Sequence, residues 1–296
     1  MNAINKMSIS RGAEWLLRGF ALLGRAPLLL GAAGGLLGLV AGLGLIVSGN
    51  NMTGNLVVQL LITVLSPLLL GGLVWTVREV DQGRSPAVGD LMQGLRADKA
   101  PKLLALLLPQ LLAAAVLFVL LMLLVGKDAL LAFVDLVANV EQGRQPTPDD
   151  LKDFPAGRFL LWLLLLVGVA MLTAFSTFTA YPQVMFDQRN PLQAIRNSLQ
   201  ACFRNLLAVL LFFILLAIAL LAVNIAVMLV GGVVGLVAGE RGALLVVQVL
   251  TMAVLMPVMA GAFYAAWADM HGTASDASGH DQAVVPPPVN GGSIEV

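Results

Sequence analysis

The side chains that could carry chemistry inside the hydrophobic stretches of this chain are polar but neutral. The clearest candidates are Gln59, Gln110, Asn224 and Gln248. Such amides can line a pathway for a neutral or lipid-like solute, or they can bond across helices and to backbone groups freed by proline. Proton-coupled pumps and transporters instead need an ionisable group within the membrane. Two alternatives therefore stay open for these residues, a polar pathway and structural hydrogen bonding.

The sequence offers little material for catalysis or metal binding. Its two histidines, His271 and His280, lie at or beyond the last hydrophobic stretch, and its single cysteine, Cys202, falls on the apolar face of an amphipathic segment. Nucleophilic catalysis needs a base within reach of the nucleophile, and a structural zinc site needs four ligands. We therefore expect a non-enzymatic protein without a cofactor or a metal ion.

Composition excludes an ordinary soluble domain. The 296 residues are 59% hydrophobic and 11% charged, whereas soluble domains carry about 25% charged residues. The 17 basic and 17 acidic residues cancel, so no basic surface of the kind that attracts nucleic acid is expected. The lipid bilayer is the partner that this composition predicts.

Six uncharged stretches are long enough to cross a bilayer, which takes about 20 apolar residues in a helix. We therefore predict an all-α polytopic membrane bundle over residues 1–272, followed by a disordered tail over 273–296, whose proline and glycine content cannot bury a core. The fifth stretch runs on through several glycines, and we expect its helix to bend or end near Gly231 and Gly232. The predicted spans are 27–47, 56–75, 103–125, 159–180, 206–229 and 242–267.

The distribution of Lys and Arg predicts the orientation. Twelve of the 17 basic residues lie in the leader and in the second and fourth connections, and five lie in the other connections. Because Lys and Arg are retained on the cytoplasmic side, we expect both termini in the cytoplasm.

Each cytoplasmic segment carries an amphipathic helix just before an odd-numbered span. The clearest one begins at Asn190 and Pro191, a favoured N-cap and a favoured first helical residue. In the leader, Arg11, Arg18 and Arg25 recur every seven residues, so they form one stripe that could attract anionic headgroups. The pattern indicates surface helices and a threefold repeat of helix, span, span.

Two glycine ridges are candidate helix-packing sites. Such ridges let helix backbones approach closely, either between copies of a chain or within one monomer. A homo-oligomer interface and internal packing are therefore both open, as is a membrane-protein partner. The ridges consist of Gly34, Gly38 and Gly42 in the first span and of Gly231, Gly235 and Gly239 after the fifth.

A further group of residues carries a family resemblance. The fourth connection holds Tyr181, Pro182, Asn190, Pro191, Leu192, Ala194, Ser198 and Asn205, and the leader holds Trp15, Phe20, Arg25 and Pro27. With these residues the chain resembles uncharacterised proteobacterial inner-membrane proteins of about six spans, which are distantly similar to the membrane domain of some glycerophosphoryl diester phosphodiesterases. The resemblance implies a bacterial inner membrane. It brings no catalytic residue, because the phosphodiesterase domain is absent from this sequence.

Two hypotheses of function follow. The leading one is a non-enzymatic inner-membrane protein that acts by packing with lipid, with itself or with a partner. The alternative is a transporter or exporter of a neutral or amphipathic solute, which the repeats and the neutral polar residues favour.

Overall fold

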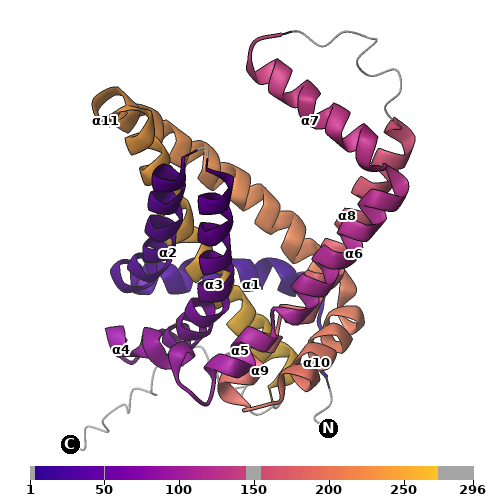
Figure 1. Cartoon of the computed structure of the whole chain (residues 1–296). Helices are drawn as coiled ribbons and strands as arrows, with labels where there is room; N and C mark the ends of the chain where they lie inside the picture. The colour runs from indigo at the N-terminus through magenta and orange to yellow at the C-terminus, as the bar shows by residue number, and fades with distance from the viewer. Residues whose placement is uncertain (1–3, 50, 145–154, 273–296) are drawn as a thin grey trace, which may run out of the picture.

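Every regular element is a helix in the part of the chain that the structure describes. The computed structural model describes residues 4–49, 51–144 and 155–272, so the tail predicted for 273–296 lies outside it. Figure 1 shows how the helices are arranged. They are α1 Arg11–Arg25, α2 Pro27–Ser48, α3 Met52–Asp81, α4 Val88–Leu91, the 3-10 helix η1 Met92–Leu95, α5 Ala100–Ala105, α6 Leu108–Leu124, α7 Lys127–Glu141, α8 Ala156–Thr177, α9 Ala180–Phe186, α10 Pro191–Arg204 and α11 Leu206–His271.

Five helical segments among the described residues are long and apolar enough to cross a membrane. The first four are α2, α3, the pair α5 and α6, and the pair α8 and α9, and each coincides with one predicted span. The fifth is α11, whose 66 residues cover both remaining spans. A straight helix of that length would measure about 100 Å at 1.5 Å per residue, far more than a hydrocarbon layer of about 30 Å.

α11 instead folds back on itself at Gly239. This residue has φ 73°, a left-handed conformation that glycine adopts readily. Gly231 faces Val247 and Gly235 faces Ala243 across the turn, so the arm formed by residues 206–238 and the arm formed by 240–271 contact each other next to it. Figure 1 shows the chain reversing direction there. The break predicted at Gly231 and Gly232 is wrong. Both residues stay helical, and the turn falls instead beside Glu240 and Arg241, whose charges are costly to keep in hydrocarbon.

The order of elements follows the predicted repeat of one lead-in helix and two spans. α1 leads into α2 and α3, and α10 leads into the two arms of α11. Between them, α4 and η1 lead into α5 with α6 and α8 with α9. The lead-in of this middle unit is much shorter than the other two.

α1 is amphipathic, and its apolar face covers both arms of α11. Its glycines permit the close approach: a Cβ at Gly19 would lie 2.5 Å from the carbonyl oxygen of Val258, and one at Gly12 would collide with the carbonyl oxygen of Ala208. Between these contacts the side chain of Trp15 is fully buried. α1 therefore holds the two ends of the α11 hairpin together.

The first glycine ridge packs within the chain. A Cβ at Gly38 would lie 2.5 Å from the carbonyl oxygen of Gln248, and one at Gly34 would collide with that of Met252. Gly42 continues the contact along the same arm of α11, beside Leu245. Of the two alternatives for this ridge, the geometry supports internal packing rather than a free oligomer interface.

The hairpin of α6 and α8 is attached more loosely. α6 contains no buried residue, and α8 is buried only in its last turn. The two helices hold each other, since the Trp162 Nε1–H donates to the carbonyl oxygen of Leu117 at 2.9 Å. Figure 1 shows the hairpin leaning away from α2 and α3. We call the end of the bundle that carries α4, α5, α9 and α10 the basal end.

Replacing Gly38 by alanine should destabilise the fold. The added methyl group would press on the α11 backbone, and overpacking of this kind costs about 1–3 kcal/mol. The control is Gly168→Ala in α8, where a Cβ meets nothing within 4 Å. In mild detergent, the thermal unfolding temperature should fall clearly for Gly38→Ala and should not fall for Gly168→Ala. Equal stability of the two variants would contradict the packing described above.

Candidate functional site

An apolar groove separates the α6 and α8 hairpin from the rest of the bundle. Its volume is about 510 Å³, and no charged side chain lines it. Ala114 and Ala170 in its wall are exposed, so the groove opens at the surface of the bundle. The lining residues are Leu70, Gln110, Ala113, Ala114, Leu117, Val169, Ala170, Thr173, Ala174, Thr177, Tyr181, Phe213, Met259 and Phe263.

The polar groups of the groove gather towards its basal end. α6 begins there, so Gln110 lies nearer to that end than Leu117, and α8 ends there, so Thr177 lies nearer to it than Val169. Tyr181 follows on α9. The groove therefore changes from polar to apolar along its length.

Only two of these polar groups are available to a ligand. The hydroxyl of Thr173 donates to the carbonyl oxygen of Val169 at 2.8 Å, and that of Thr177 donates within its own helix. The ring of Tyr181 stacks on Phe263 at 6.4 Å between ring centres. Within the described residues, neither the Tyr181 hydroxyl nor the Gln110 amide forms a hydrogen bond.

A break between α8 and α9 places Tyr181 in the groove. The backbone turns at Thr179, with φ −108° and ψ 1°, which frees main-chain groups that must find new partners in a membrane. Ser198 of α10 supplies them: its hydroxyl accepts from the Thr179 N–H at 3.0 Å and donates to the Phe175 carbonyl oxygen at 2.7 Å. Ser198 thus supplies a partner to one main-chain group on each side of the break.

A buried network continues from this break to the end of α11. The Gln183 side chain is fully buried, donates to the Thr179 carbonyl oxygen at 3.2 Å and accepts from the Asn197 amide at 3.2 Å. The His271 Nε2 lies 3.2 Å from the Thr179 hydroxyl. Thr179 is fully buried as well, so its hydroxyl is closed to a substrate, and its contact with His271 joins α9 to the end of α11.

The network includes residues whose role was not predicted from the sequence. His271 lies at the end of the last span, as expected, and is the last residue of α11. Its contact with Thr179 was not predicted. No role was predicted for Gln183 either. The sequence did contain a signal for this role. Gln183 follows Pro182 and lies three residues after the predicted span 159–180, and a helix that breaks in a membrane needs a polar side chain nearby.

Asn205 joins the N-terminal segment to the α10 and α11 junction. Its side-chain oxygen accepts from the Met7 N–H at 2.7 Å, and its amide donates to the Asn5 carbonyl oxygen at 3.0 Å. The Asn5 N–H donates in turn to the Met270 carbonyl oxygen at 3.0 Å. Together with Ser198 and Trp15, these contacts give structural roles to residues on which the family resemblance rests.

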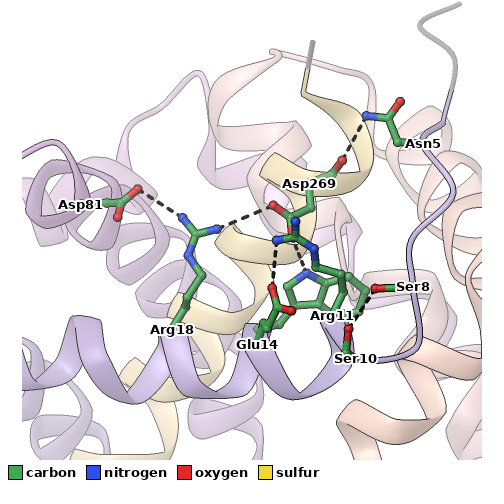
Figure 2. A network of polar contacts seen from close by, with 9 residues as sticks. Asn5, Ser8, Ser10, Arg11, Glu14, Arg18, Asp81 and Asp269 are labelled. Atoms are coloured by element: carbon green, nitrogen blue, oxygen red, sulfur yellow. Dashed lines mark hydrogen bonds and ion pairs between the residues drawn. The ribbon is translucent and has the colours of Figure 1, made fainter. Parts of the chain in front are cut away.

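The arginine stripe of α1 pairs with acids at the ends of two spans. Figure 2 shows Arg18 between Asp81 of α3 and Asp269 of α11, at 3.8 and 3.6 Å. Arg11 lies 3.7 Å from Asp269, and Arg25 lies 3.7 Å from Asp81. Asp269 also accepts a hydrogen bond from the Trp15 Nε1–H at 2.8 Å. The stripe therefore ties α3 and α11 together, in addition to any contact with lipid headgroups.

The predicted polar residues do not converge on one path. Gln110 lines the groove, whereas Gln59 is exposed on α3. Asn224 donates to the Leu220 carbonyl oxygen of its own helix at 3.2 Å, and Gln248 packs beside the glycine ridge of α2. In the second ridge, Gly231 and Gly235 line the inside of the α11 hairpin and Gly239 forms its turn.

Cys202 is a buried thiol in α10. It is fully buried and lies 3.6 Å from the Phe175 carbonyl oxygen. Burial raises the pKa of the Cys202 thiol to about 12, so the thiol stays protonated at neutral pH and is a poor nucleophile. No group of three or more His, Cys, Asp or Glu side chains that could hold a metal ion occurs among the described residues.

Replacing Asp269 by alanine should cost far more stability than breaking an exposed ion pair. The variant leaves the buried Trp15 N–H without an acceptor, a loss of about 1–3 kcal/mol, and removes one ion-pair partner from each of Arg11 and Arg18. The matched control is Asp98→Ala, because Asp98 and its partner Arg96 are 64% and 61% exposed and such pairs contribute at most about 1 kcal/mol. Unfolding in detergent measures the stability of both variants. A larger loss of stability for Asp98→Ala than for Asp269→Ala would count against the role assigned to Asp269.

Comparison with known protein families, with curated proteins and with solved structures finds no match to this chain.

Proposed function

We propose that this chain is a multi-pass protein of the bacterial inner membrane that acts by binding lipid rather than by catalysis. The apolar helices support the membrane location, and the family resemblance supports the bacterial inner membrane. The excess of Lys and Arg in the leader and in the second and fourth connections supports a cytoplasmic basal end, with both termini on that side.

The groove is the observation that carries the proposal. It is uncharged, it is walled by helices from four parts of the chain, and it opens on the outer face of helices that cross the bilayer. A polar solute would gain nothing from its alanine, valine and leucine walls, whereas an apolar chain fills such a cavity favourably. The hydrocarbon chain of a lipid is therefore its natural occupant.

Other modes of action have less support in the geometry. The glycines of α2 that could join two copies already contact α11 of the same chain. Among the described residues, a hydroxyl meets a histidine at Thr179 and His271, and the burial of Thr179 keeps its hydroxyl from acting as a nucleophile on a substrate. Lipid binding uses a surface that the fold leaves open.

Filling the groove tests the proposal. Ala114→Phe places a ring in the groove, and Ala115→Phe places the same ring on the next residue of α6, which is exposed but does not line the groove. In native mass spectra from mild detergent, the wild type and Ala115→Phe should retain bound lipid and Ala114→Phe should lose most of it. Equal retention by the two variants, or a wild-type protein free of lipid, would overturn the proposal.

A second candidate function is the transport of a neutral or amphipathic solute, and a second cavity favours it. This polar cavity of about 600 Å³ is lined by Asp187, Gln188, Arg189, Asn190, Gln193 and His271. On α11, His271 lies two turns beyond the groove-lining Phe263, and α9 lies between the two cavities in the chain. Burial raises the pKa of the Asp187 carboxyl, against the effect of a hydrogen bond from Trp267. A solute could pass from one cavity to the other if α9 moved.

Flux measurements in proteoliposomes separate transport from binding. Under the transport hypothesis, Gln110→Leu should abolish the flux of an amphipathic solute, because Gln110 lines the groove. Asn224→Leu should leave the flux unchanged, because Asn224 bonds within its own helix. No flux of any neutral or amphipathic solute through the wild type would eliminate transport and leave lipid binding as the function.

A further inference from the structure

Building on the proposed function, we infer that the groove binds an acyl ester of a membrane lipid, with the ester carbonyl oxygen accepting a hydrogen bond from the Tyr181 hydroxyl. The proposal assigns the class of ligand, the polar group that is recognised and the residue that recognises it. It rests on the lipid-binding groove described above, and its test separates the two.

The first argument is the state of the Tyr181 side chain. It is 5% exposed, it lines the groove, and its hydroxyl forms no hydrogen bond within the described residues. The hydroxyl is not among the polar atoms that protein encloses without a partner, so it is open to the groove. Tyrosines whose rings are buried usually bond their O–H. An acceptor supplied by a ligand in the groove would satisfy it.

The second argument is the order of polarity along the groove. Tyr181 and Gln110 lie at the basal end, and alanine, valine and leucine side chains line the walls farther from it. Tyr181 lies in the last part of the candidate span Ala156–Phe186, six residues before the charged Asp187, so it lies near the level where hydrocarbon meets the headgroup region. A lipid of the basal leaflet has the same order, with ester carbonyls at that level and chains towards the bilayer centre.

The third argument is the absence of charge in the lining. The groove offers a hydroxyl and an amide but no Lys, Arg or His. A fatty acid carboxylate would therefore enter without a counter-ion, at high cost inside the membrane. A plain hydrocarbon would leave the Tyr181 hydroxyl unpaired. A neutral ester carbonyl accepts the hydrogen bond and adds no charge.

The test compares lipids that differ only at the ester. The probes are a phosphatidylethanolamine with two ester-linked chains and its analogue with two ether-linked chains of the same length, which lacks the carbonyl oxygens. The two lipids compete for the detergent-solubilised full chain, and native mass spectra measure how much of each stays bound. The ester lipid should be retained about two- to tenfold better than the ether lipid, which is the factor that one net hydrogen bond supplies.

Two variants assign the preference to Tyr181. Tyr181→Phe removes only the hydroxyl and should bind both lipids equally. The control is Tyr264→Phe, which changes the other tyrosine of the chain, a residue that is equally buried but does not line the groove. It should keep the preference for the ester. A preference that survives Tyr181→Phe would overturn the assignment of the donor.

Further outcomes separate this inference from the proposed function. If the wild type retains ester and ether lipids equally and Ala114→Phe displaces both, the groove binds lipid but does not recognise the ester. If Ala114→Phe displaces neither, the proposed function itself fails. Diacylglycerol, which carries the ester without the phosphate headgroup, should compete as well as the phospholipid. Failure of diacylglycerol to compete would place recognition in the headgroup and overturn the inference.

Discussion

The close approach of α1 and α2 to the second arm of α11 is the interaction on which the rest of the structure depends. Helices in a bilayer gain no hydrophobic energy from contact with one another, so small residues and tight packing must hold them together. Gly19 meets Gly261 at one crossing, and Gly34 and Gly38 meet the α11 backbone at the other. α6 has no comparable contact. Because α1 and α2 pack tightly on α11 while α6 and α8 pack loosely on the bundle, a groove remains between the α6 and α8 hairpin and the other helices.

The groove has a polar end because the helix formed by α8 and α9 breaks at Thr179, inside a segment that crosses the membrane. The turn at Thr179 frees backbone groups, and α10 supplies a buried serine to bond them. The same turn brings Tyr181 beside Phe263 and into the groove wall. The hydrogen bonds of Ser198 and Gln183 thus maintain the local fold. The Tyr181 hydroxyl takes no part in these bonds and is available to a ligand. Structural polar groups and a candidate binding group lie within a few residues of each other for this reason.

Charge is confined to the ends of the bundle, where it also has a structural role. Asp81 ends α3 and Asp269 lies in the last turn of α11, and both face the arginines of α1 (Figure 2). Their side chains are only 12% and 16% exposed, so these pairs are better shielded from solvent than the pair of Arg96 and Asp98. α1 therefore fixes the basal ends of two spans by packing on one face and by charge on another.

The sequence by itself determined the class of the protein, the first four spans, the amphipathic lead-in helices α1 and α10 and the start of α10 at Asn190. These features depend on residue type and on spacing along one helix, and a helix in lipid forms its hydrogen bonds internally. Only the tertiary structure decided the turn at Gly239, the partners of the arginine stripe, the place of His271 and the groove. Each of these depends on which distant segments meet, and spacing within one helix carries no information about that. Gln59, Gln110, Asn224 and Gln248 looked alike in the sequence, yet only Gln110 reaches the groove, because its helix is the one that stands apart from the core.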